Sequence, residues 1–233
     1  MFKRTTESEN MRSMIEFWKG FKQLPSAWLL LVQLLILVLS VYTNASRSYQ
    51  ILTWLLGVSA LLIIAKEIRQ TPTFTLLSLT FVTGAFVLSF LMLIGFHSVT
   101  LQIFAHSFEA AAYFCAAYGL IRYMFADRYL TKDELFAAGA VFTLIAWGFA
   151  FLYSICQLMV PQSFQNPNHV AYYQSWLDLL FISFSPQSAT GLSDLIPFAP
   201  AARVISMLQM FCGVMYFALI VSRMIALQYI ENK

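Results

Sequence analysis

Charged residues are scarce in this sequence. Only 11% of the 233 residues are Asp, Glu, Lys or Arg, and 60% are hydrophobic, whereas soluble domains carry about 25% charged residues. This deficit excludes a soluble domain and predicts an all-α membrane protein. The net charge of +3 comes from basic residues scattered at the ends of apolar runs. It therefore indicates no nucleic-acid partner.

Cysteine is also rare, and its placement excludes a disulfide framework. The three cysteines, Cys115, Cys156 and Cys212, fall in apolar runs, where packing is their expected role. The sequence also lacks a nucleophile, an acid–base pair or a phosphate-binding loop at a recognisable spacing, so we expect no enzyme. We also expect no cofactor, and no bound metal ion because the potential ligands His106 and Glu109 have no third ligand within sequence reach.

Long apolar runs dominate what is present. They predict about six membrane-spanning helices, at 27–45, 50–65, 73–96, 99–122, 134–159 and 201–227. Lys and Arg gather before the first run, after the second, and between the fourth and fifth, so both termini are expected in the cytoplasm. The loop before the last span then lies on the outer side.

The segment between the last two spans has a different pattern. A helix is predicted from about Val170 to Ser185, too short to cross a hydrocarbon core of about 30 Å, which takes about 20 helical residues. The polar stretch from Ser188 to Asp194 does not continue this helix. Non-helical backbone at membrane depth is tolerated only where protein or a water-filled cavity surrounds it. The pattern therefore predicts a re-entrant pore helix and a pore loop.

The same segment carries several short motifs in one collinear order. They are the stretch Asp178–Phe184, then Gly191 and Asp194, then Pro197, Pro200 and Arg203, and finally Gly213, Tyr216, Ala218 and Arg223. In this order the segment resembles the pore module of the tetrameric potassium-channel superfamily, in particular its bacterial two-helix form. The first four predicted spans carry no such resemblance.

The resemblance implies a homotetrameric cation channel in a bacterial inner membrane, with K+ and Na+ as permeant ions. It implies a selectivity filter made of Ser188, Ala189, Thr190, Gly191, Leu192, Ser193 and Asp194. Asp178 would support the pore helix. Gly213 would be the hinge of the inner helix, although close helix packing is also open to it. We divide the chain into an interfacial or cytoplasmic segment 1–25, a four-helix domain 26–132 and a pore domain 133–233, and expect no soluble ligand-binding domain.

The filter departs from the family pattern T-V-G-Y-G at four positions. Ala189 replaces Thr and lacks its hydroxyl, Thr190 replaces Val, and Leu192 replaces Tyr. Ser193 replaces the second Gly, which adopts positive φ more readily than an L-residue does. Pro186 removes a backbone donor in the last turn of the pore helix. Potassium selectivity depends on stacked rings of backbone carbonyls, so these changes predict weak discrimination between K+ and Na+.

The first four spans occupy the position of a voltage sensor but lack its ladder of basic residues. The fourth span instead contains His106 and Glu109, three residues apart and therefore on one helix face. They form either a local hydrogen-bonded pair or a proton-sensing or ion-coordinating site. Two other functions stay open: a non-conducting scaffold or sensor with a degraded pore module, and a proton-coupled transporter that uses this pair.

Overall fold

The computed structural model describes residues 24–42, 72–95, 98–126, 132–167 and 172–231. These residues are mostly helical, which confirms the predicted helical class. The helices are α2 (Pro25–Leu39), the short 3-10 helix η1 (Ser40–Tyr42), α4 (Pro72–Ile94), α5 (Val99–Met124), α6 (Lys132–Met159), α7 (Trp176–Gln187) and α8 (Pro200–Glu231). Two strands of two residues each, β1 (Phe164–Gln165) and β2 (Ile196–Pro197), pair antiparallel.

Five of the six predicted spans coincide with α2, α4, α5, α6 and α8. The predicted span 50–65 lies outside the described residues, as does nearly all of the segment 1–25. In the part of the chain that the structure describes, three helices are long and apolar enough to cross a membrane: Pro25–Tyr42, Asp133–Met159 and Pro200–Ile225. These three helices fit a membrane protein.

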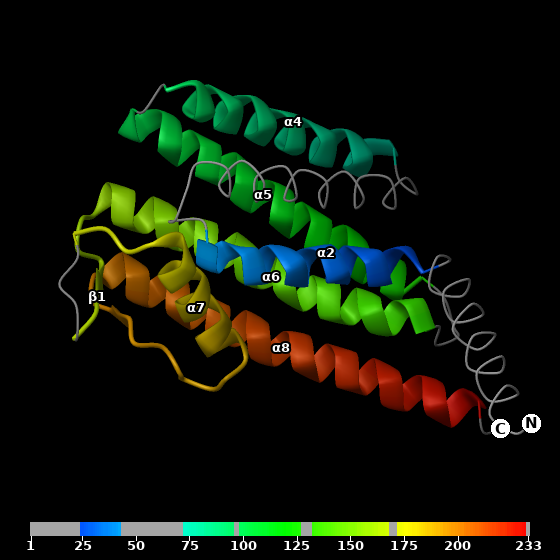
Figure 1. Ribbon diagram of the computed structural model, residues 1–233. Coiled ribbons are helices and arrows are strands. Elements are labelled where there is room, and N and C mark those ends of the chain that lie inside the picture. Colours follow the sequence, from blue (N-terminus) through cyan, green and yellow to red (C-terminus); the bar gives the residue numbers. More distant parts are fainter. Residues whose placement is uncertain (1–23, 43–71, 96–97, 127–131, 168–171, 232–233) are drawn as a thin grey trace, which may run out of the picture.

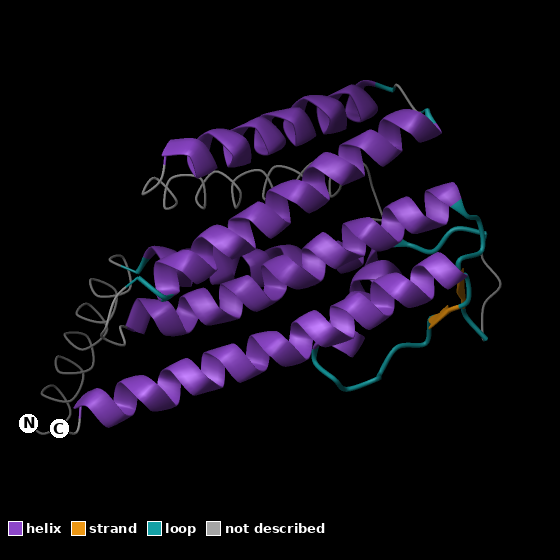
Figure 2. Ribbon diagram, turned by 180° about the vertical axis from the view of Figure 1, so that it is seen from behind, coloured by secondary structure: helices purple, strands orange, loops and turns teal. Residues whose placement is uncertain are grey.

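The long helices lie side by side along one common direction (Figures 1 and 2). The central helix is α6, which packs against α2, α5, α7 and α8. Its buried stripe includes Ala140, Val141 and Leu144, none of which has any exposed surface. α4 packs on α5 at one edge of the bundle, and α8 lies at the opposite edge (Figure 1).

Polar side chains join the helices at one end of the bundle. The Asp133 carboxylate, in the first turn of α6, accepts hydrogen bonds from the backbone N–H and the hydroxyl of Ser26, at 3.1 and 2.7 Å. Arg223 of α8 forms an ion pair with Glu134 at 3.2 Å, and its guanidinium lies 4.8 Å from the centre of the Phe125 ring. The start of α6 is thereby tied to the start of α2 and to the last turns of α8.

At the other end of the bundle, the chain enters between the helices as α7 and then runs back to the same end. Halfway along α6, the Gln187 side chain at the end of α7 donates to the carbonyl of Phe142 at 2.6 Å. The chain then runs back to β2, which pairs with β1 beyond the end of α6 (Figure 1). α7 begins at Trp176, later than the predicted start near Val170, and residues 168–171 lie outside the described part.

Candidate functional site

The first turn of α7 is closed by a capping box. The Ser175 hydroxyl accepts from the backbone N–H of Asp178 at 3.2 Å, and the Asp178 carboxylate accepts from the backbone N–H of Ser175 at 3.3 Å. The same carboxylate accepts from the Ser175 hydroxyl at 2.7 Å. These reciprocal bonds satisfy amide donors that a helix start leaves open. The structure thus places Asp178 in the first turn of the predicted pore helix, where it caps the helix together with Ser175.

The last turn of α7 is closed by a Schellman motif. The Thr190 N–H donates to the carbonyl of Ser185 and the Ala189 N–H donates to that of Pro186, both at 3.2 Å. Ala189 has a φ of 57°, the left-handed conformation that this motif requires and that Gly usually supplies. Two residues assigned to the filter, Ser188 and Ala189, therefore serve here as the end of the helix.

The rest of the predicted filter is an exposed loop. Thr190, Gly191, Leu192 and Asp194 are exposed, and Leu192 is 69% exposed. Gly191 has a φ of 68°, whereas Ser193, at the second glycine position of the family, does not have positive φ. The Ser193 hydroxyl accepts from the backbone N–H of Leu195 at 3.1 Å, just before the chain reaches β2.

A buried polar network holds the underside of α7 against α6 and α8. Gln209 of α8 has no exposed surface, and its amide donates to the Ser183 carbonyl at 2.8 Å and to the Gln187 Oε1 at 3.1 Å. Its own carbonyl oxygen accepts from the Tyr153 hydroxyl at 2.6 Å. The Ser183 hydroxyl donates in turn to the carbonyl of Ala146 on α6. Three helices thus share one set of hydrogen bonds.

The end of α7 approaches α8 closely at Gly213. A Cβ placed on Gly213 would lie against the carbonyl oxygen of Gln187 and 2.9 Å from its Cα. Such a contact is with backbone, which cannot move aside as a flexible side chain can. Gly213 is therefore where the end of α7 rests on α8, and α8 continues as a helix from Pro200 to Glu231.

The returning chain is braced at the end of the bundle. The backbone N–H groups of Phe198 and Ala199 donate to the carbonyl of Ser163, at 2.8 and 3.2 Å. The Arg203 side chain donates from Nε to the carbonyl of Pro197 at 3.2 Å. The loop that carries Asp194 is therefore anchored on both sides.

The structure brings Asp178, Gly213 and the predicted filter residues into one unit around α7. His106 and Glu109 lie apart from it, on α5. Sequence reasoning missed Gln209, Ser183, Gln187 and Tyr153, although a glutamine inside an apolar run such as that of α8 is costly to bury alone and could have indicated a partner. Among the described residues, no three His, Cys, Asp or Glu side chains gather in a way that could hold a metal ion.

The comparisons with known proteins add no identity. No family model, curated protein or solved structure matches this chain.

Proposed function

We propose that this chain is one protomer of a homotetrameric cation channel of the potassium-channel type, permeable to K+ and weakly selective against Na+. The observation that carries the proposal is the path of α7. This twelve-residue helix ends beside Gly213, midway along α8, and an exposed polar loop follows it. In a membrane such a loop needs protein or water around it, and copies of the same loop around a shared axis supply both.

The surface of α8 also supports assembly. Its buried positions form a narrow stripe, which includes Ala202, Ser206, Gln209, Gly213 and Tyr216. Many of the remaining positions carry exposed large apolar side chains, among them Met207, Phe211, Val214 and Phe217. In the most apolar stretch of α8 only 22% of the residues are buried in the protomer, whereas 61% are buried in that of α6. We therefore assign α8 to the lining of the pore and to contacts with neighbouring protomers.

Weak selectivity follows from the backbone of the loop. A potassium filter needs successive carbonyl rings of uniform geometry. Here Ala189 closes α7 instead, and Ser193 binds the backbone of Leu195. Fewer residues are then left to form rings of carbonyls. The Asp194 carboxylates would still concentrate cations at the mouth.

The deciding experiment is to measure currents from the purified protein in planar bilayers with K+ on one side and Na+ on the other. We expect cation currents whose reversal potential lies well short of the K+ equilibrium value. A reversal potential at that value would refute weak selectivity. Silence under voltage, tension and pH steps would refute conduction.

A non-conducting scaffold is the second candidate, and the Schellman motif at Ala189 favours it. A helix end that uses the first filter positions shortens the conducting segment. The same bilayer recording distinguishes the two functions, because a scaffold gives no current even when the tetramer is intact.

A further inference from the structure

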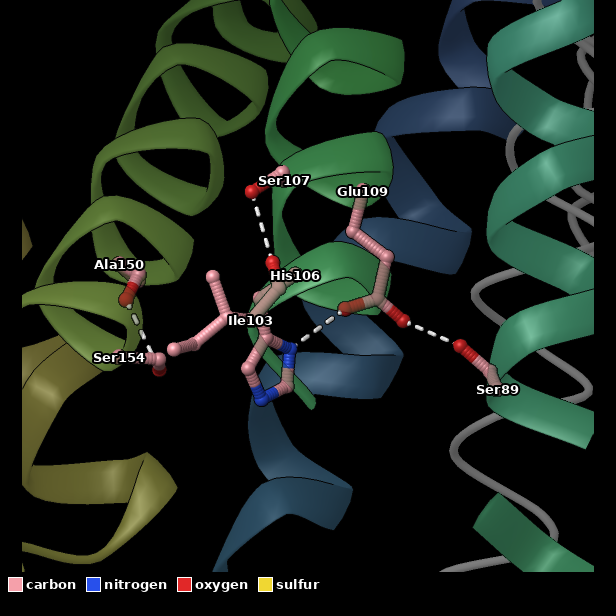
Figure 3. Close-up of polar contacts among 7 residues, drawn as sticks. All are labelled: Ser89, Ile103, His106, Ser107, Glu109, Ala150 and Ser154. Carbon is pink, nitrogen blue, oxygen red and sulfur yellow. Dashed lines mark hydrogen bonds and ion pairs between the residues drawn. The ribbon is translucent and has the colours of Figure 1, made fainter. Parts of the chain in front are cut away.

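His106 and Glu109 form a closed polar group between α5 and α4. His106 Nδ1 lies 2.9 Å from Glu109 Oε2, and the Ser89 hydroxyl of α4 donates to Glu109 Oε1 at 2.7 Å (Figure 3). The two side chains are 22% and 17% exposed. The nearby hydroxyls of Ser107 and Ser154 bind carbonyls of their own helices instead. Both oxygens of the Glu109 carboxylate therefore have a partner, and neither side chain of the pair is fully buried.

Few other titratable groups face the pair. α4 carries none between Pro72 and Gly95. Three other sets of titratable groups lie on the helices around the pair. They are Tyr113, Cys115, Tyr118, Arg122 and Tyr123 on α5 itself, Lys132, Asp133, Glu134, Tyr153 and Cys156 on α6, and Asp178 on α7. Of these, Tyr153 is bonded to Gln209, Asp133 to Ser26 and Asp178 to Ser175. Among the residues that the structure describes, His106 is the only histidine, the residue type that most readily gains or loses a proton near neutral pH.

Aromatic rings connect this pair to the start of α7. The His106 ring centre lies 5.6 Å from that of Phe151 on α6, and the Phe151 ring centre lies 4.6 Å from that of Trp176. Trp176 is the first residue of α7 and follows the capping residue Ser175. Tyr113 stacks on Phe151 from α5 at 5.5 Å, which restricts the directions in which Phe151 can move.

We infer that His106 and Glu109 form a proton-binding site that controls the position of α7 through Phe151 and Trp176. Protonation of the imidazole turns a carboxylate beside a neutral ring into an ion pair, so the net charge of the pair changes from −1 to 0. The imidazolium then lies within the roughly 6 Å over which a cation attracts an aromatic ring. Phe151 responds to this attraction, and Trp176 follows because the two rings are in contact.

This inference rests on the proposed function in one respect, that movement of α7 alters conduction. The binding site and the relay are tested without current, by fluorine NMR of the full chain in nanodiscs, labelled with 5-fluorotryptophan. The Trp176 resonance is identified by its loss in W176F. We expect it to shift between pH 8 and pH 5 in the wild type and not in H106Q. The variants H97Q and H169Q, which alter the other two histidines of the chain, serve as matched controls and should keep the shift.

Two further variants separate the site from the relay. In E109Q the pH dependence of the shift should differ from that of the wild type, because the carboxylate that contacts the His106 ring is gone. In F151L the Trp176 shift should disappear while the His106 ring protons still titrate, which also shows that the variant is folded. A Trp176 resonance that does not titrate, or that titrates equally in H106Q or F151L, overturns the inference.

Bilayer currents test the regulatory step. Current through the wild-type channel should change between pH 8 and pH 5, and the change should be lost in H106Q and F151L but kept in H97Q. Currents that respond to pH equally in H106Q overturn the regulation. If Trp176 titrates through His106 but no current flows at any pH, the proton site stands and the channel function fails.

Discussion

Gly213 is a residue at which α7 and α8 lie in close contact. In G213A the added methyl group meets the backbone of Gln187, so α7 or α8 must shift. Overpacking of this kind costs about 1–3 kcal/mol, more than the roughly 1 kcal/mol that Ala gains over Gly in a helix. We expect a lower melting temperature in detergent. The control is G139A, whose Cβ would meet Leu30 Cδ2, a terminal methyl, at 3.0 Å. Equal stability of the two variants would contradict the close contact.

Gln209 is the residue on which the buried network depends. The variant Q209L keeps the size of the side chain but removes the donor to Ser183 and the acceptor for Tyr153. Each buried polar group left without a partner costs about 1–3 kcal/mol. We expect a lower melting temperature together with a change in the K+/Na+ permeability ratio, because α7 loses its tie to α8. M210L, at the neighbouring exposed position, is the control and should change neither. A Q209L protein with wild-type stability would show that the network does not stabilise the fold.

Three residues of the site differ in how far the sequence indicates their role. Asp178 three positions after Ser175, with apolar residues following, is the pattern of a capping box, and the structure has one there. Ala189 gave no such indication, because the left-handed position of a Schellman motif usually holds Gly or Asn. The hydrogen bonds of Gln209 depend on residues of three helices, and no spacing along one helix predicts which will meet.

Among the secondary-structure elements, long helices were the easiest to predict. Apolar runs bounded by Pro72, Ser98 and Pro200 set the starts of α4, α5 and α8 to within a residue or two. The pairing of β1 with β2 was not predicted. Each strand has two residues, and the two lie far apart in the chain, so neither alternation nor a hairpin turn marks them.

The loop after α7 determines the predicted selectivity. Replacing Ala189–Ser193 with T-V-G-Y-G puts a β-branched residue where φ is 57°, which disfavours the Schellman motif and frees the backbone for the filter. We expect the reversal potential to move toward the K+ equilibrium value. A gain of 1.4 kcal/mol in differential binding corresponds to about a tenfold preference.

The control for this replacement is L192Y alone. It introduces the aromatic residue but leaves Ala189 and the helix end intact, so its reversal potential should stay at the wild-type value. A full replacement that conducts with unchanged selectivity would show that the loop does not set ion preference.

At the scale of the whole molecule, the exposed face of α8 predicts assembly. We expect native mass spectrometry in mild detergent to show four copies. The variant F211S, on this face, should lower the tetramer fraction. V87S, on the exposed surface of α4 at the other edge of the bundle, should not. Wild-type protein that is only monomeric or dimeric would count against the tetramer.

The two ends of α7 have an electrostatic consequence. Aligned peptide dipoles give a helix about half a positive charge at its start and half a negative charge at its end. The Asp178 carboxylate opposes the positive start, whereas no basic residue lies in the last turn of α7 to oppose its negative end. Four such ends around one axis would favour cations over anions whatever the loop sequence. Exchange of the loop should therefore raise the preference for K+ over Na+ while chloride stays excluded.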